Sequence, residues 1–246
     1  MNVFKHIGLF FLMIRQVFHK PEKASIYFKQ TVKEVDSLGI DSLGIVAILS
    51  VFMGAVIVIQ TAFGIDSAWI PLYLIGFTAR ESIILEFSPT ILSLILAGKV
   101  GSHIASEIGT MRVTEQIDAL EIMGVNSAGY LIMPKIVAAI FIFPFLVVLS
   151  MGLAIFGGWI VGVSAGVVTT SDFVYGLQYE FKPFNIIYAL IKTVFFAFII
   201  VSVSSYCGYY TKGGSLEVGR SSTQAVVYSS IVILLFNLLI TQLLLG

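Results

Sequence analysis

Charged side chains are scarce in this chain. Only 11% of its 246 residues are Asp, Glu, Lys or Arg, while 58% are hydrophobic. Soluble globular domains carry about 25% charged residues, so this chain has too few charges to cover a surface in water. Its 14 basic and 14 acidic residues cancel, and no basic cluster indicates a nucleic-acid partner. The composition therefore predicts an integral membrane protein.

Cysteine and histidine are also rare. A single cysteine, Cys207, excludes an intrachain disulfide and a Cys-rich metal site. The histidines are His6, His19 and His103, and none belongs to a pattern with a nucleophile or a set of metal ligands. His103 and Glu107 are four residues apart, which is typical of a structural pair on a helix. We expect no catalytic residue, no metal and no bound cofactor in this chain.

Long apolar runs, in contrast, are abundant. A helix needs about 20 apolar residues to cross a bilayer. Five segments reach this length: 42–65, 70–98, a run between Lys135 and Asp172, 184–206 and 225–245. The sequence therefore predicts an all-α membrane protein with five transmembrane helices and its two termini on opposite sides.

The basic residues indicate which side is cytoplasmic, because Lys and Arg concentrate in cytoplasmic segments. With the N-terminus inside, eleven of the 14 basic residues fall in cytoplasmic segments: Lys5, Arg15, Lys20, Lys23, Lys29, Lys33, Lys99, Arg112, Lys135, Lys212 and Arg220. Only Arg80, Lys182 and Lys192 remain. The bias predicts a cytoplasmic N-terminus and an external C-terminus.

Residues 1–40 are predicted to form a helical segment at the membrane surface. On a helix, Lys5 and Arg15 fall on one half, and Phe4 and Phe11 lie mostly opposite, as in an in-plane interfacial helix. Pro21 is expected to end this helix, and a second helix over 22–39 leads to the first span. The apolar core is short and lacks a cleavage site, so a signal peptide is not expected. A membrane anchor is favoured over a gating role.

One polar segment interrupts the apolar runs. Residues 107–124 read EIGTMRVTEQIDALEIMG and lie between the second and third spans, on the predicted cytoplasmic side. Thr114 is predicted to cap a short amphipathic helix, with Glu115 and Asp118 in its first turn and Gly124 at its end. A solvated loop helix and a docking element both fit this pattern. The excess of acids favours docking, because basic residues suit an anionic leaflet better.

The polar segment is part of a longer recognisable pattern. EFSP at 86–89, AGKVG at 97–101, SEIGTMRVTEQIDALEIMG at 106–124 and YLIMP at 130–134 resemble the MlaE-type permease family of ABC transporters. GGSLEVGRSSTQAVVYSS at 213–230 extends the resemblance, which covers about residues 40–246. Residues 41–246 are therefore expected to form an MlaE-type transmembrane domain that follows the N-terminal segment.

The resemblance implies a function and a set of partners. Such permeases move phospholipids between the inner and outer membranes of bacteria, so we expect this chain in the inner membrane, with a periplasmic C-terminus. It is expected to form a homodimer and to bind a periplasmic MCE-domain protein. Each copy is expected to bind one cytoplasmic ABC ATPase, which binds ATP and Mg, and a small regulatory subunit is allowed. The chain has no G-x-x-x-x-G-K-[ST] motif, so ATP is expected to be hydrolysed only by the partner.

In this family a coupling helix within the polar segment contacts the ATPase. The residues carried over to this role are Glu107, Arg112, Glu115, Gln116, Asp118 and Glu121.

Three alternative functions remain open. An ABC permease for another hydrophobic cargo, such as a sterol or a toxin, would share the fold and the coupling helix. A membrane-embedded lipid enzyme would need a catalytic constellation that the sequence does not offer. A structural assembly protein would bind the ATPase without ATP-dependent movement of lipid.

Charges within the predicted spans mark a candidate lipid cavity. Glu86 lies in the second span, where an ionisable residue is costly and faces a bundle interior or a wet cavity; a packing carboxyl is the alternative. The family often has Arg before this Glu, where this chain has Leu85, and Arg80 is the candidate to replace it. Lys192 is expected either to snorkel outward or to pair with Glu86. Arg80 and its neighbour Glu81 are not expected to face each other on a helix.

Three glycines, Gly158, Gly162 and Gly166, recur every four residues near the end of the third span. Small residues at this spacing let two membrane helices approach closely. We expect them to serve helix packing.

Overall fold

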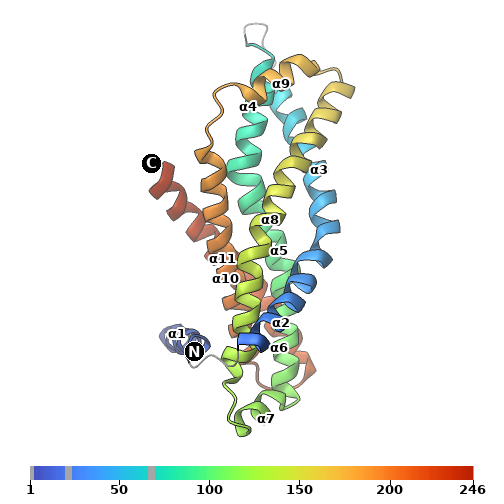
Figure 1. Ribbon diagram of the computed structural model, residues 1–246. Coiled ribbons are helices and arrows are strands. Elements are labelled where there is room, and N and C mark those ends of the chain that lie inside the picture. The colour runs from blue at the N-terminus through green and yellow to red at the C-terminus, as the bar shows by residue number, and fades with distance from the viewer. Residues whose placement is uncertain (1–2, 20–23, 66–69, 246) are drawn as a thin grey trace. The chain divides into compact units, whose positions relative to one another are not determined.

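The computed structural model describes residues 3–19, 24–65 and 70–245. Within these residues the protein is helical and has no strand, so it is an all-α membrane protein (Figure 1). The elements are α1 (Val3–Val17), α2 (Ala24–Val35), π-helix η1 (Asp36–Ile40), α3 (Asp41–Gly64), α4 (Tyr73–Ser82), π-helix η2 (Ile83–Ile91), α5 (Leu92–Leu96), π-helix η3 (Ala97–Gly101), α6 (Ser102–Val113), α7 (Gln116–Ile122), α8 (Ser127–Ser164), α9 (Thr170–Gln178), α10 (Phe184–Tyr209) and α11 (Ser215–Leu245).

Five helical stretches in the described residues are long and apolar enough to cross a membrane, as predicted. They are Ile26–Gly64, Tyr73–Val113, Ser127–Ser164, Phe184–Tyr209 and Ser215–Leu244. The second stretch is longer than its apolar run, because α4, η2, α5, η3 and α6 follow one another without a break. The π-helix η2 contains Pro89, which has no N–H to donate to an α-helical turn. The residues that follow the predicted second span therefore continue its helix as far as Val113.

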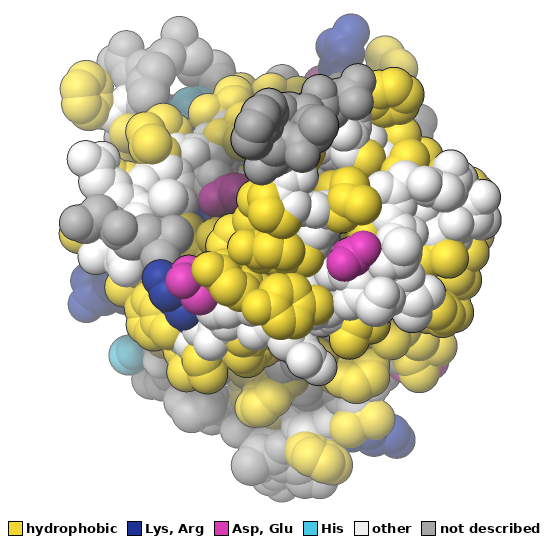
Figure 2. Space-filling model, turned by 90° about the horizontal axis from the view of Figure 1, so that it is seen from above, with side chains coloured by type: hydrophobic (Ala, Val, Ile, Leu, Met, Phe, Trp, Pro, Cys, Tyr) yellow, Lys and Arg dark blue, Asp and Glu magenta, His cyan; other side chains and the backbone are white. Residues whose placement is uncertain are grey.

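Large hydrophobic side chains are exposed along these helices. On α11, Leu234, Leu235, Leu238 and Leu243 are each more than half exposed. Figure 2 views the molecule from above, and there too hydrophobic side chains are exposed, between scattered charged groups. Exposed apolar surface of this extent marks a contact with lipid or with another protein, and here it lies on helices long enough to span a bilayer.

The chain is divided into two compact units. The first comprises Met1–Asp41, Ser93–Phe143 and Val194–Gly246, and the second comprises Ser42–Leu92 and Pro144–Thr193. The polar segment 107–124 belongs to the first unit. The candidate lipid-cavity residues belong to the second, so each site is held within a single unit.

In the second unit, α4 and α9 lie side by side (Figure 1). A Cβ added to Gly176 of α9 would lie 2.0 Å from the Tyr73 carbonyl oxygen of α4, so only glycine permits this approach. Buried Ile75, Ala79 and Phe173 form a core with Val58 of α3.

Glycines also bring α3 and α8 together in the second unit. A Cβ on Gly158 would lie 2.6 Å from a methyl group of Val58, and one on Gly162 would lie 2.8 Å from the same side chain. The packing role predicted for these two glycines is confirmed. It is wrong for Gly166, which lies beyond the end of α8 with φ = 70° and has open space around its Cα. Gly166 serves the turn after the helix, because φ in this range costs a residue with a Cβ.

Gly157 offers a direct test of this contact. A Cβ there would lie 2.3 Å from the Val51 carbonyl oxygen, a backbone atom that cannot rotate away. We expect Gly157→Ala to lower the free energy of unfolding by at least about 2 kcal/mol, measured by denaturation in detergent. Gly152→Ala, in the same helix but with nothing within 4 Å, should be neutral or stabilising because alanine favours helix. Equal stability of the two variants would contradict the close contact.

In the first unit, α6 packs against α10 and α11. A Cβ on Gly208 of α10 would lie 2.7 Å from the Ala105 carbonyl oxygen, and Gly109 of α6 faces Val218 of α11. α1 belongs to this unit, since the His6 Nδ1 and Tyr206 hydroxyl lie 2.7 Å apart. α6 is therefore held firmly where the polar segment begins.

α1 has the amphipathic character that the sequence predicts. Met13 and Val17 are buried, whereas Phe4, Phe11 and Phe18 are each more than half exposed. The exposed aromatic side chains suit a membrane surface. The expected helix end at Pro21 lies outside the described residues.

Candidate functional site

The polar segment folds as two helices joined by a tight turn. Thr114 follows α6 and donates its hydroxyl to the Thr110 carbonyl (2.8 Å). Glu115 adopts φ = 59°, in the left-handed region, and α7 starts directly after it. Gly124, with φ = 78°, follows α7 as predicted. The segment thus ends α6 and begins α7 within two residues, and both turn residues are exposed.

The predicted start of this helix is wrong. Thr114 does not cap α7, and Glu115 lies in the turn, where its side chain makes no capping hydrogen bond. The reason is local, because a threonine hydroxyl readily bonds the carbonyl four residues earlier, and this competes with N-capping. The short α7 therefore starts at Gln116 and ends at Ile122.

The tip of this segment combines acidic and apolar groups. Glu115 and Gln116 are exposed, and Arg112 of α6 pairs with Asp118 of α7 at 2.6 Å, with both side chains partly in solvent. The next exposed groups are apolar: Ile122 is 88% and Met123 is 68% exposed, while Ile117 is fully buried. A rigid projection with acidic groups and exposed apolar side chains is typical of a protein-docking surface.

Glu121 differs from Asp118, the other acid of α7, because its carboxylate is bonded to α8 and α10 and not to α6. Its Oε1 accepts hydrogen bonds from the hydroxyls of Ser127 and Tyr209, each at 2.9 Å. The two hydroxyl oxygens are themselves 2.8 Å apart. Together with Asn126 and His19, among others, these residues line a pocket of about 290 Å³. Glu121 therefore connects α7 to the first residue of α8 and the last residue of α10.

Glu107 is likewise engaged inside the protein. Lys135 of α8 lies 2.7 Å from the Glu107 carboxylate of α6 and 2.7 Å from the Glu34 carboxylate of α2. The pairing of Glu107 with His103 predicted from the sequence is not the one formed, and His103 is exposed. A buried ammonium group attracts a carboxylate more strongly than an imidazole on the same helix does. Lys135 thus joins three helices.

Loss of this buried cation should destabilise the first unit. We expect Lys135→Met to lower the free energy of unfolding by about 1 to 3 kcal/mol, because Glu34, only 17% exposed, would lose its partner, whereas Glu107, 40% exposed, can be hydrated. Thermal or denaturant unfolding in detergent measures the effect. Lys33→Met removes an exposed lysine from α2 and should change stability little. A Lys135→Met protein as stable as the Lys33→Met control would show that the three charges are not coupled.

In the second unit, the candidate lipid-cavity residues form two clusters. In the first, Lys192 donates to the Glu86 carboxylate (2.9 Å) and to the Leu85 carbonyl (3.3 Å). Lys192 is fully buried, whereas the Glu86 side chain is 47% exposed, and Thr90 donates to its other oxygen. Of the two expectations for Lys192, pairing with Glu86 is the one observed. The pair buries its cation and leaves its anion accessible.

The second cluster surrounds Arg80. Its guanidinium donates to the carbonyls of Leu177 (2.7 Å) and Tyr179 (2.9 Å) and pairs with Glu81 (2.6 Å). Asn185 donates to the other Glu81 oxygen. The prediction that Arg80 and Glu81 do not face each other is wrong, because the carbonyls after α9 and the amide of α10 draw both side chains to the same place. Arg80 is only 2% exposed and holds the α9–α10 connection against α4.

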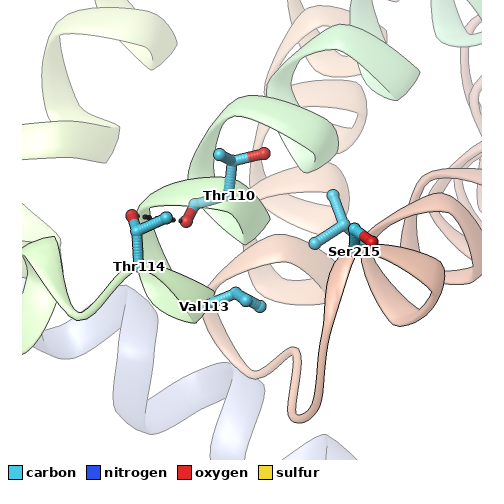
Figure 3. Close-up of a pocket in the computed structure, with 5 residues that line it drawn as sticks. Thr110, Val113, Thr114 and Ser215 are labelled. Atoms are coloured by element: carbon cyan, nitrogen blue, oxygen red, sulfur yellow. Dashed lines mark hydrogen bonds between the residues drawn. The ribbon is translucent and has the colours of Figure 1, made fainter.

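A small pocket lies beside the turn of the polar segment. It has a volume of about 200 Å³ and is lined by Thr110, Val113 and Thr114 of the α6 end and by Ser215 and Val218 of α11. Figure 3 shows these side chains and the hydrogen bond from Thr114 to Thr110. The pocket places the start of α11 next to the turn that carries Glu115.

Sequence reasoning missed several residues of both sites. Tyr209 ends a span, where an aromatic residue is ordinarily explained as an interfacial anchor. Ser127 and Asn185 start helices, and Glu34 lies in the N-terminal segment far from its partner. Ser127 lies only six residues from Glu121, but the break between α7 and α8 separates them. The other contacts join residues distant in the chain, so no local pattern indicates them.

The fold and the site define a multi-pass α-helical membrane protein with a structured polar projection between two spans. The profile of the family described as Permease MlaE matches residues 31–243, and the chain belongs to this family. A probable ABC transporter permease protein of Rickettsia bellii is 39% identical, over 89% of this chain and 84% of the relative. The chain is therefore a membrane permease of the ABC transporter class.

Two further relatives carry more specific names. The intermembrane phospholipid transport system permease protein MlaE of Haemophilus influenzae is 29% identical, over 96% of this chain and 90% of its own length. The chloroplastic protein trigalactosyldiacylglycerol 1 of Arabidopsis thaliana is 31% identical, over 89% of this chain and 63% of its own length.

Proposed function

We propose that this chain is the membrane-spanning subunit of an ABC transporter that moves phospholipids between the inner and outer membranes of a bacterium. It works as a homodimer in the inner membrane, with its N-terminus in the cytoplasm and its C-terminus in the periplasm. A cytoplasmic ABC ATPase binds ATP and Mg and supplies the energy. A periplasmic MCE-domain protein continues the lipid path.

The observation that carries this proposal is the projection formed by α6, the turn at Glu115 and α7. It is polar in a chain that is otherwise apolar, and it joins two helices long enough to span the bilayer. Ile122 and Met123 are exposed beside its acidic groups, which is the composition that a partner protein can bind. Movement of the ATPase against this surface would reach the spans directly, because α6 continues the second span.

The charged clusters of the second unit support a cargo with long apolar chains. Lys192 and Arg80 are buried and already neutralised by Glu86 and Glu81, so neither presents a free cation to a phosphate. The accessible charge is the half-exposed carboxylate of Glu86. We infer that the path through the spans accommodates acyl chains chiefly by apolar contact, with Glu86 at its polar edge.

A transfer assay tests the proposal. The permease and its ATPase are reconstituted in liposomes that contain fluorescent phospholipid, and transfer to acceptor vesicles is followed with ATP. We expect ATP-dependent transfer of phospholipid, and none when the ATPase lacks its phosphate-binding lysine. Transfer of a labelled sterol in place of phospholipid would favour the alternative hydrophobic cargo. ATPase binding with no movement of either lipid would favour a structural role.

A further inference from the structure

We propose that Glu121, Ser127 and Tyr209 form the link through which movement of α7 reaches α10, so that Glu121 is a positioning residue and not a docking residue. The inference rests on the proposed function, because it takes α7 to be the surface that the ATPase moves. It assigns the acids of the turn and of α7 to two different tasks. Glu115 and Asp118 face the partner, and Glu121 faces the spans.

The covalent chain connects α7 to only two spans. α6 precedes it through the turn at Glu115, and α8 follows it after Gly124. α10 is distant in the chain, so a displacement of α7 reaches it through packing, either by way of α6, which Gly208 of α10 contacts, or through side-chain contacts of α7 itself. Tyr209 is the last residue of α10, and its hydroxyl donates directly to the α7 carboxylate at 2.9 Å.

The chemistry of this contact suits the transmission of a displacement. Both hydroxyl groups donate to one oxygen of a charged carboxylate, and such charge-assisted hydrogen bonds are about twice as strong as neutral ones. Ser127 is 2% and Tyr209 is 8% exposed, whereas Glu121 is exposed, so the two donors are shielded from water and the acceptor is not. The guanidinium of Arg112, whose partner is Asp118 of α7, also lies 5.9 Å from the Tyr209 ring. α7 therefore contacts Tyr209 through its carboxylate and through an ion-paired arginine.

The base of this link is fixed by a neighbouring asparagine. The Asn126 amide donates to the carbonyls of Gln16 (2.8 Å) and His19 (2.6 Å) at the end of α1, and its oxygen accepts the Gly129 N–H. This capping orders the start of α8 next to Ser127. The residue before Ser127 is therefore tied both to the end of α1 and to the first turn of α8.

Two substitutions separate transmission from docking. Glu121→Gln removes the charge but keeps an oxygen that accepts hydrogen bonds, so ATPase co-purification should stay within about twofold of wild type, while the weaker neutral hydrogen bonds should lower the phospholipid transferred per ATP. Tyr209→Phe keeps the charge and the ring but removes the hydroxyl. It should leave ATPase co-purification and ATP hydrolysis within about twofold, while phospholipid transferred per ATP falls at least fivefold. Tyr210→Phe is the matched control at the next residue and should behave as wild type.

A second readout does not depend on the cargo. An environment-sensitive fluorophore on Phe195→Cys, which is 47% exposed on α10, reports α10 movement when ATP binds, in a Cys207→Ser background. We expect a nucleotide-dependent signal that Tyr209→Phe abolishes and Tyr210→Phe preserves. An unchanged signal in Tyr209→Phe would overturn the link, as would loss of ATPase binding in Glu121→Gln. If the wild-type complex gives the nucleotide-dependent fluorescence change but transfers no phospholipid, the proposed cargo is refuted, while the proposed link between α7 and α10 is not.

Discussion

Reversing the exposed acids of the projection is expected to abolish ATPase binding. In Glu115→Lys with Asp118→Lys, co-purification of the ATPase should fall at least tenfold while the permease stays inserted and dimeric. The two new ammonium groups replace carboxylates that are exposed or partly exposed, and a charge of the wrong sign within an interface costs several kcal/mol. Affinity purification from detergent-solubilised membranes, followed by quantification of both chains, measures the loss.

The chain offers a close control for this experiment. Glu180 is also an exposed glutamate with positive φ, 45° against 59° for Glu115, but it lies in the α9–α10 connection of the second unit. Glu180→Lys applies the same change of charge at a similar backbone conformation and should retain the ATPase fully. If Glu115→Lys, Glu180→Lys and the double variant all retain the same amount of ATPase, the projection is not the surface that binds the ATPase.

The Glu86–Lys192 pair is expected to give the second large effect, and an asymmetric one. Glu86→Leu would leave the fully buried Lys192 ammonium without its carboxylate, at a cost of about 3 to 5 kcal/mol. Lys192→Met should cost much less, because the Glu86 side chain is 47% exposed and can be hydrated or protonated. Unfolding of each variant in detergent, compared at one pH, measures the difference.

The double variant separates stability from transport. Glu86→Leu with Lys192→Met removes both charges and should regain most of the stability lost in Glu86→Leu alone. If Glu86 borders the lipid path, this stable protein should still transfer phospholipid at least tenfold more slowly than wild type, with ATPase binding intact. Normal transfer by the double variant would assign the pair to helix packing alone.

The five transmembrane helices could be predicted from the sequence, because hydropathy is a property of each local segment. Each span is recognisable from about 20 consecutive apolar residues. The helix from Ser127 to Ser164 can therefore be predicted without knowing which helices pack against it. The polar segment was also predictable, because acids and an arginine stand between two such runs. The start of α7 was not predictable. The Thr114 hydroxyl can either cap the following helix or donate to the carbonyl four residues earlier, and the sequence does not decide between the two.

The partners of the charged residues were less accessible to sequence reasoning. Arg80, Glu121 and Lys135 read as accessible charges, yet each is bonded to groups far away in the chain. The buried Arg80 and Lys135 must find partners, but which partners these and the exposed Glu121 find depends on how the helices pack. The sequence therefore identified the polar residues. It did not show which of them bond to distant helices and which remain available to a partner protein.

Native mass spectrometry of the purified complex, before and after lipid extraction, tests the central claim most directly. The account predicts two copies of this chain with two ATPase chains and co-purified phospholipid, and loss of the ATPase chains alone in the Glu115→Lys and Asp118→Lys double variant. A complex that retains its ATPase in that variant, or that carries only a ligand other than phospholipid, would contradict it.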